Sequence, residues 1–268
     1  MAVLCSTSIR CGDTLESALS TIAGMGIKDV DVLGIGNWCH VLPADLVRDF
    51  EGTAGNASRL LEKYGLTMRS MNVGTNQQLW DRKPESNEMR EKEIDALCRF
   101  MAMHGAKSAA IQPLANDYSG RSIKEVIDDC VLSLRQFIDI SARYGIKMGV
   151  ELHVYSPFET LEQVAYLFEK MPDAKIVYDP SHFAKLGIPL QSLPPDWMDR
   201  AVHVHSRDSG KDMLQAHLGQ GTVDFAWMVG ELKKRGYAGH YSIEYLQDKN
   251  DDYTPDAAKL YKLLTSLI

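Results

Sequence analysis

The chain has 268 residues, a length that one hydrophobic core can serve, so we expect a single domain over residues 1–268. Hydrophobic residues make up 45% and charged residues 24% of the chain, which excludes a disordered or fibrous protein. The formal net charge of −7 argues against a broad basic surface for a phosphate backbone, so nucleic acid is not an expected partner.

The cysteines and the first residues indicate a cytoplasmic protein. The five cysteines are odd in number and form no C-x-x-C pair, so we expect reduced thiols rather than disulfides or a zinc site. The N-terminal segment lacks the basic and apolar regions of a signal peptide, and no run of 18 apolar residues occurs. Neither export nor a membrane span is therefore expected.

One pattern recurs along the chain: a segment of helical period, then a glycine, then a short apolar or β-branched run. The glycines are Gly26, Gly65, Gly105, Gly145 and Gly236, and the first four are spaced by 39, 40 and 40 residues. Glycine suits this place because a helix commonly closes on a residue at positive φ. The chain therefore consists of repeated helix and strand units.

Eight strands are expected. In chain order they lie near 3–6, 29–33, 67–73, 109–112, 147–152, 175–179, 201–205 and 240–244. Amphipathic helices lie between them, as in 85–105 and 122–145, so the strands should form a parallel sheet. The fold class predicted is an α/β (β/α)8 TIM barrel. An open doubly wound sheet is the alternative, but no G-x-G-x-x-G or Walker-type loop supports it.

Each of the last four predicted strands ends in a side chain suited to a metal ion. These residues are Glu151, Asp179, His205 and Glu244. The C-terminal ends of barrel strands meet at one mouth, where active sites are built, so the four should lie together. Three carboxylates buried there need a cation between them. We therefore expect one divalent metal: Mn²⁺ or Mg²⁺ suits this oxygen-rich set best, with Co²⁺ or Zn²⁺ as alternatives.

A structural role is the competing interpretation for each residue taken alone. A carboxylate at a strand end is often only a helix N-cap, and the argument for a metal rests on four such residues occurring on consecutive strands. His203 lies two residues before His205. We expect it to be a core histidine one layer deeper, with a ligand role as the alternative.

These residues and their surroundings resemble the xylose isomerase-like TIM barrel superfamily, in particular its sugar phosphate isomerase/epimerase group, which includes ketose 3-epimerases, hydroxypyruvate isomerases and inosose dehydratases. The likeness covers essentially the whole chain. It rests on Glu151 in VELH, Asp179 and His182 in YDPSHF, His205 to Asp208 as H-x-x-D, the loop LGQGTVDF at 218–225 and Glu244 in SIEY.

The resemblance implies that Glu151, Asp179, His205 and Glu244 bind the metal, with Glu151 and Glu244 also acting as acid and base. It places His182 near the substrate hydroxyls. The DNA-repair endonucleases of the superfamily carry extra histidines where this chain has Asn72 and Gln112, so a trinuclear zinc site is not expected. Asp31 stands where many relatives have glutamate, and we expect a structural acid or one that supports a ligand.

Other residues are candidates for substrate contacts. Arg207 or Lys211 is expected to bind substrate hydroxyls, or else to be a solvated loop charge. Trp38 could form an apolar wall against a sugar ring, or plug the mouth or a dimer contact. His153 could touch substrate or hold a ligand in place. The loop around Trp80 is long enough to be a lid, unless it is a surface excursion.

The function expected is a metal-dependent isomerase or epimerase of a small polyhydroxylated substrate, such as a sugar, sugar acid or sugar phosphate, working through an enediolate. An inosose-type dehydratase is the nearest alternative, because the same base can lead to loss of a β-hydroxyl. A metal-dependent phosphodiesterase and a catalytically silent binding barrel are alternatives from other classes. A homodimer or homotetramer is the usual expectation for a small soluble enzyme.

Overall fold

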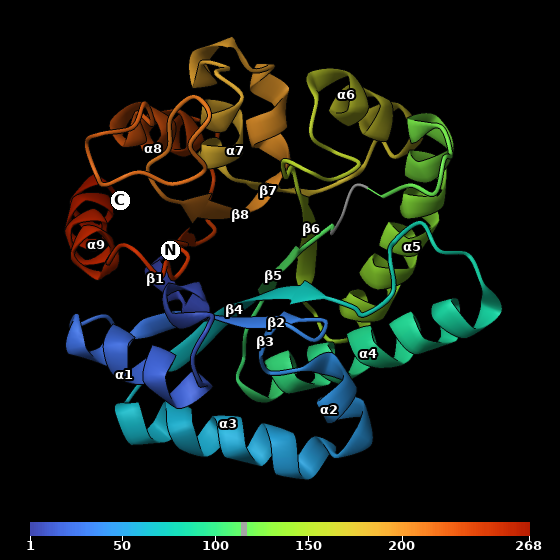
Figure 1. Ribbon diagram of the computed structural model, residues 1–268, viewed down its shortest axis with the longest axis horizontal. Helices are drawn as coiled ribbons and strands as arrows, with labels where there is room; N and C mark the ends of the chain where they lie inside the picture. The colour runs from blue at the N-terminus through green and yellow to red at the C-terminus, as the bar shows by residue number, and fades with distance from the viewer. Residues whose placement is uncertain (114–116) are drawn as a thin grey trace.

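The computed structural model of the protein describes residues 1–113 and 117–268 and shows a closed barrel (Figure 1). Its parallel strands are β1 (Val3–Ser6), β2 (Asp29–Ile35), β4 (Thr67–Gly74), β5 (Ser108–Ile111), β6 (Lys147–Glu151), β7 (Ile176–Tyr178), β8 (Ala201–Ser206) and β9 (Tyr241–Ile243). Strand β1 pairs with both β2 and β9, which closes the ring. The predicted (β/α)8 fold is confirmed.

Helices surround the strands on the outside of the barrel (Figure 1). They are α1 (Leu15–Gly24), α2 (Pro43–Arg48), α3 (Phe50–Tyr64), α4 (Pro84–Met103), α5 (Ile123–Arg143), α6 (Leu161–Lys170), α7 (Pro180–Lys185), α8 (Phe225–Lys234) and α9 (Thr254–Leu267). Short 3-10 helices are η1 (Thr7–Arg10), η2 (Leu190–Ser192) and η3 (Pro195–Arg200). Within the described ranges, no helix has the length and apolarity needed to cross a bilayer.

The helix boundaries follow from local sequence. Helix α5 begins at a capping box, in which the Ser122 side chain accepts from the Glu125 backbone N–H and the Glu125 carboxylate accepts from the Ser122 backbone N–H. All five glycines of the repeated pattern adopt positive φ, between 63° and 79°. Gly65 is the C-cap of α3, in the left-handed region that a residue with a β-carbon avoids. These glycines end the helices where the sequence predicts.

The strands agree with the predicted ranges to within two residues. Strand β7 ends at Tyr178 and β9 at Ile243, so Asp179 and Glu244 lie just past their strands. The two-residue strand β3 (Cys39–His40) was not predicted, and it folds back antiparallel on the end of β2.

The loop before α4 is attached to α5, because Ser133 Oγ donates to the Leu79 carbonyl oxygen at 2.6 Å. In this conformation the segment around Trp80 packs on a neighbouring helix.

Polar side chains reach across the barrel interior. Asp31 on β2 approaches His203 on β8, and Asn72 on β4 donates to the Glu244 carboxylate, although neither pair comes from adjacent strands. The large aliphatic and aromatic side chains form one continuous cluster that includes residues of the surrounding helices. Barrel interiors are usually filled by bulky branched residues. This barrel instead has a polar interior leading up to its mouth.

Close packing between β6, β7 and β8 predicts the effect of adding one methyl group. A β-carbon at Gly149 would lie 2.6 Å from the Ile176 carbonyl carbon and 2.7 Å from Val202 Cγ2. We expect Gly149→Ala to lower the free energy of unfolding by about 1–3 kcal/mol, because the backbone of β7 must shift. Urea unfolding followed by circular dichroism measures the change.

Gly55→Ala is the matched control. Gly55 lies inside α3, and a β-carbon there meets no atom of the described residues within 4 Å. Alanine should raise the free energy of unfolding by about 0.5–1 kcal/mol, because it restricts the unfolded chain. Equal effects of the two substitutions would contradict the packing argument.

Candidate metal centre

Four side chains from successive strand ends meet at the barrel mouth. Glu151 is the last residue of β6, Asp179 is the N-cap of α7, His205 lies in β8 and Glu244 follows β9. One potential ligand atom from each lies within 4.8 Å of the others. All four residues are buried. The chain thus brings together the residues that the sequence proposed as ligands, and their binding of a metal stays a prediction.

His205 is central to this group. Its Nδ1 lies 2.8 Å from Glu151 Oε1 and 3.2 Å from Glu244 Oε2. Asp179 has two roles, since its Oδ1 accepts from the Ser181 backbone N–H at 2.8 Å while its Oδ2 faces the cluster. The helix-cap interpretation of Asp179 is therefore correct and leaves one carboxylate oxygen for the centre.

Two further cationic or ionisable groups lie against the four. Arg207 is buried, and its Nη2 lies 3.2 Å from Asp179 Oδ2 while its Nη1 lies 3.5 Å from Glu244 Oε2. His182 Nε2 lies 3.3 Å from Asp179 Oδ2 and 3.6 Å from Glu151 Oε1. Burial in the cluster excludes the solvated-charge interpretation for Arg207.

The charge of this group fits one divalent cation. Three carboxylates and the Arg207 guanidinium leave two negative charges, and Glu151 Oε2 has no hydrogen-bond partner among residues 1–113 and 117–268. Burial alone would raise the pKa of Glu151, but His205 and His182 outweigh it and lower that pKa. Burial alone would lower the pKa of His205, but Glu244 and Glu151 raise it well above its ordinary value. These neighbours favour the protonated form of His205 in the metal-free cluster, which adds a positive charge to that of Arg207.

The remaining substrate-binding candidates lie at different depths. Lys211 is exposed, and Trp38 is 49% exposed. The His153 ring centroid is 4.0 Å from that of His182, and its Nδ1 contacts the Val154 carbonyl oxygen. Burial and the neighbouring His182 lower the pKa of His153 to about 4, so its imidazole is neutral at physiological pH. His153 supports His182 from the side, whereas Lys211 and Trp38 lie at the surface.

Sequence reasoning missed the role of Asn72. Its Nδ2 donates to Glu244 Oε1 at 2.8 Å across the barrel. Its position near the end of a predicted strand could have suggested this, but the partner lies 172 residues away.

Asp208 of the H-x-x-D motif does not join the cluster. Its carboxylate accepts from the backbone N–H groups of Ser209, Gly219 and Gly221, which fixes the loop at 218–225.

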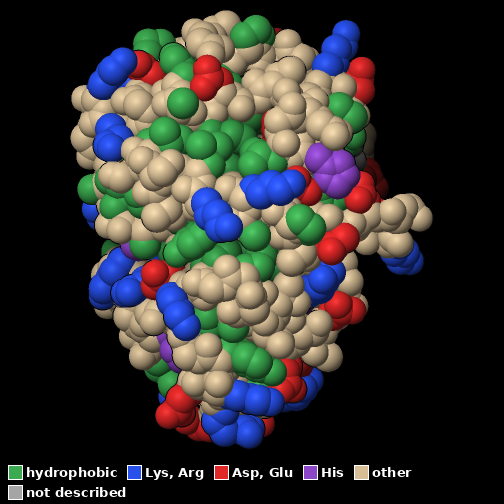
Figure 2. Space-filling view, turned by 90° about the vertical axis from the view of Figure 1, so that its left-hand side faces the viewer, with side chains coloured by type: hydrophobic (Ala, Val, Ile, Leu, Met, Phe, Trp, Pro, Cys, Tyr) green, Lys and Arg blue, Asp and Glu red, His purple; other side chains and the backbone are tan. Residues whose placement is uncertain are grey.

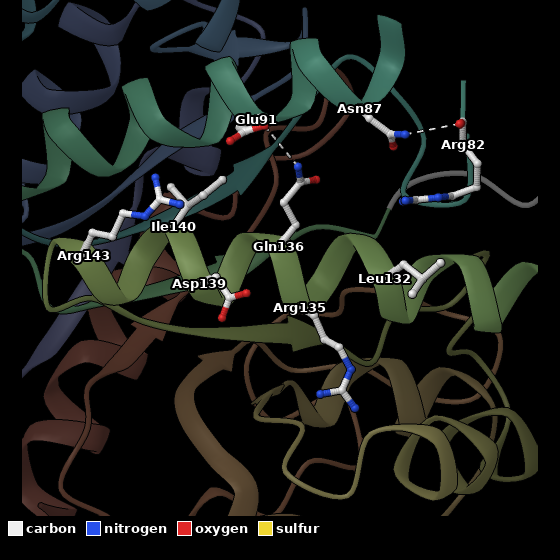
Figure 3. A pocket seen from close by; sticks show the side chains of 9 residues that line it. All are labelled: Arg82, Asn87, Glu91, Leu132, Arg135, Gln136, Asp139, Ile140 and Arg143. Atoms are coloured by element: carbon white, nitrogen blue, oxygen red, sulfur yellow. Dashed lines mark hydrogen bonds between the residues drawn. The ribbon is translucent and has the colours of Figure 1, made fainter. Parts of the chain in front are cut away.

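One external groove lies away from this centre. It has a volume of about 430 Å³ and runs between α4 and α5, lined by residues such as Glu91, Gln136 and Arg143 (Figure 3). None of the predicted site residues lines it. Figure 2 shows one face of the molecule, on which Lys and Arg side chains are scattered among acidic ones.

Because His205 carries a proton in the metal-free cluster, metal affinity should depend on pH. A cation must displace that proton, so the association constant for Mn²⁺ should rise about tenfold per pH unit below the raised pKa of His205. Isothermal titration between about pH 5.5 and about pH 7.5 measures this. His217→Gln, a change at a histidine paired with Asp256, should leave the dependence intact. A constant affinity over this range would contradict the assignment.

Comparisons with known proteins agree with this architecture. The family model described as "Xylose isomerase-like TIM barrel" matches residues 22–264. The inosose dehydratase of Lactiplantibacillus plantarum is 24% identical over 265 residues, which cover 85% of this chain and 88% of that protein. Matches to three other curated relatives span only 43% to 61% of their lengths.

Solved structures share the fold over the whole chain. A D-allulose 3-epimerase from Methylomonas sp. superposes with a TM-score of 0.75 at 18% identity, covering 100% of this chain and 98% of the other. The IOLI protein, solved with a zinc atom, gives a TM-score of 0.69 at 15% identity, covering 100% and 99%. With strand order, mouth residues and the family match in agreement, this chain belongs to the xylose isomerase-like TIM barrel family.

Proposed function

We propose that the chain is a divalent-metal-dependent isomerase or epimerase that moves a proton on a small sugar or sugar acid through an enediolate. The observation that carries this proposal is that two buried glutamates from different strands meet at one atom of His205, Nδ1. Glu151 comes from β6 and Glu244 from the end of β9, and each has a carboxylate oxygen within 3.2 Å of the imidazole. A substrate held between them presents opposite faces of one carbon to two carboxyl groups.

The two glutamates are not equivalent. Glu151 Oε2 has no hydrogen-bond partner in the part of the chain that the structure describes, so we assign it as the oxygen that accepts a proton from the substrate carbon. Glu244 is held more firmly, because Oε1 accepts from Asn72 and Oε2 faces Arg207. We assign Glu151 as the base that removes the proton and Glu244 as the acid that returns one to the opposite face.

A divalent cation held by Glu151, Asp179, His205 and Glu244 would stabilise the negative charge that develops on the substrate oxygens. Arg207 and His182 can donate hydrogen bonds to neighbouring hydroxyls, as their contacts with Asp179 place them beside the cluster. A nearby cation lowers the proton affinity of a carboxylate, and burial raises it. Burial therefore opposes the lowering of the Glu151 pKa, although His205 and His182 outweigh it in the metal-free cluster.

Inosose dehydration is the second candidate, favoured by the curated relatives. Two of them, from Bacillus licheniformis and Lactiplantibacillus plantarum, are inosose dehydratases at 28% and 24% identity. After the same proton removal, the electron pair would expel a β-hydroxyl as water instead of being reprotonated. The structural likenesses, which include a 3-keto-D-glucoside 4-epimerase and D-psicose 3-epimerases, support the epimerase proposal.

Replacing either glutamate should remove activity without unfolding the chain. We expect Glu151→Gln and Glu244→Gln each to lower kcat by about 10²- to 10⁴-fold, because an amide cannot accept or return the proton. Metal content by mass spectrometry and the melting temperature should be measured beside turnover. Glu62→Gln, on the exposed side of α3, is the control and should keep full activity. Full activity in both site variants would contradict the proposed roles.

Solvent isotope incorporation separates the two reactions. With Mn²⁺ and a panel of ketoses in D₂O, an epimerase should place deuterium at the carbon next to the carbonyl without loss of water. With a keto-polyol, a dehydratase should instead produce enone absorbance. Nuclear magnetic resonance and ultraviolet spectroscopy detect these outcomes. Incorporation of deuterium into the ketose without formation of an enone supports the epimerase proposal. Formation of an enone without deuterium exchange into any ketose would contradict it and support the dehydratase.

A further inference from the structure

A second group of metal-binding side chains lies inside the barrel, beneath the candidate centre. It consists of Asp31 on β2 and His203 and His205 on β8, and one ligand atom from each lies within 4.8 Å of the others. All three side chains are fully buried. Strands β2 and β8 are not neighbours, so the group closes across the interior. We name Asp31, His203 and the Nε2 atom of His205 the inner triad.

The atoms of the inner triad are spaced for a metal ion rather than for hydrogen bonds. Asp31 Oδ2 lies 3.4 Å from His203 Nε2 and 3.5 Å from His205 Nε2. Hydrogen bonds of this kind are usually about 2.7–3.2 Å long. Bonds of about 2.0–2.1 Å from a tetrahedral zinc ion hold two donor atoms roughly 3.3 Å apart. The observed separations are closer to the second geometry.

The polar atoms of the inner triad are also without partners. Neither oxygen of Asp31, neither nitrogen of His203, nor Nε2 of His205 makes a hydrogen bond within the described residues. Ser70 and Ser242 are paired in register with Asp31 and His205, and their hydroxyls are equally unpartnered. Buried polar groups in native proteins are nearly always satisfied. These polar atoms are therefore available to bind an ion or ordered water.

We propose that the inner triad is a second metal site, which takes a zinc-like divalent transition metal, with His205 bridging it to the outer centre. Two imidazoles and one carboxylate favour Zn²⁺ or Co²⁺, whereas the outer set of three carboxylates and one imidazole favours Mn²⁺ or Mg²⁺. His205 offers Nδ1 to the outer ion and Nε2 to the inner one. Ordered water is the competing occupant.

The charges of the inner site balance. When the outer ion occupies Nδ1, binding of the inner ion displaces the Nε2 proton of His205 to solvent. The resulting imidazolate and the Asp31 carboxylate then carry two negative charges, which match one divalent cation, and His203 binds as a neutral ligand. The proposal goes beyond the proposed function, since the inner triad needs no sugar substrate.

Metal stoichiometry tests the inner site. The purified chain is freed of metal with a chelator and titrated with Co²⁺ while visible absorption and calorimetry are recorded. We expect two ions per chain, with the intense absorption of tetrahedral cobalt arising from the inner site. His203→Gln and Asp31→Asn should each bind one ion and lose that absorption. Asp29→Asn, on the same strand but paired with Arg69 at the surface, is the matched control and should bind two.

A second measurement does not depend on how the variants fold. Wild-type crystals grown with Zn²⁺ should show an anomalous-scattering peak between Asp31 and His203. A single bound ion in solution together with the absence of that peak would overturn the proposal and leave water in this layer. If the wild-type chain binds two metal ions but turns over no sugar, only the proposed function is contradicted, and the inner metal site stands.

Discussion

Closure of the barrel forces like charges together, and the rest of the site depends on this constraint. Four consecutive strands end at one mouth, and three of them deliver a carboxylate that is almost completely buried. Such a cluster is stable only with positive charge inside it. Arg207 supplies part of that charge, and a proton on His205 supplies more in the metal-free chain. A bound cation would meet the same demand.

The strands and their polar ends could be predicted from sequence because they depend on local patterns. β-branched runs mark the strands, and Glu151 or His205 is visible as a polar residue where such a run stops. The glycines that close the helices are equally local. For this reason both the barrel and the meeting of four candidate ligands followed from residue order and from the geometry of parallel strands.

Contacts across the barrel could not be predicted in this way. From sequence alone, Arg207 could be a solvated charge in a loop. Its burial depends on Asp179 and Glu244, which come from other strands. The bond between Asn72 and Glu244 joins residues far apart in sequence, and the approach of Asp31 to His203 does the same. The alternation of residues along a strand shows which face of the sheet a side chain occupies, but not which side chain lies opposite it across the barrel. The supporting residues therefore appear only once the ring is closed.

Asp179 uses its two carboxylate oxygens for two different contacts. One carboxylate oxygen accepts from the first turn of α7, and the other faces Arg207 and the cluster. These two contacts fix the plane of the carboxyl group, so little reorganisation would accompany the binding of a cation. A longer acid would be unable to serve both partners at once. The Asp179 carboxylate therefore serves two independent partners, the backbone of α7 and the Arg207 side chain.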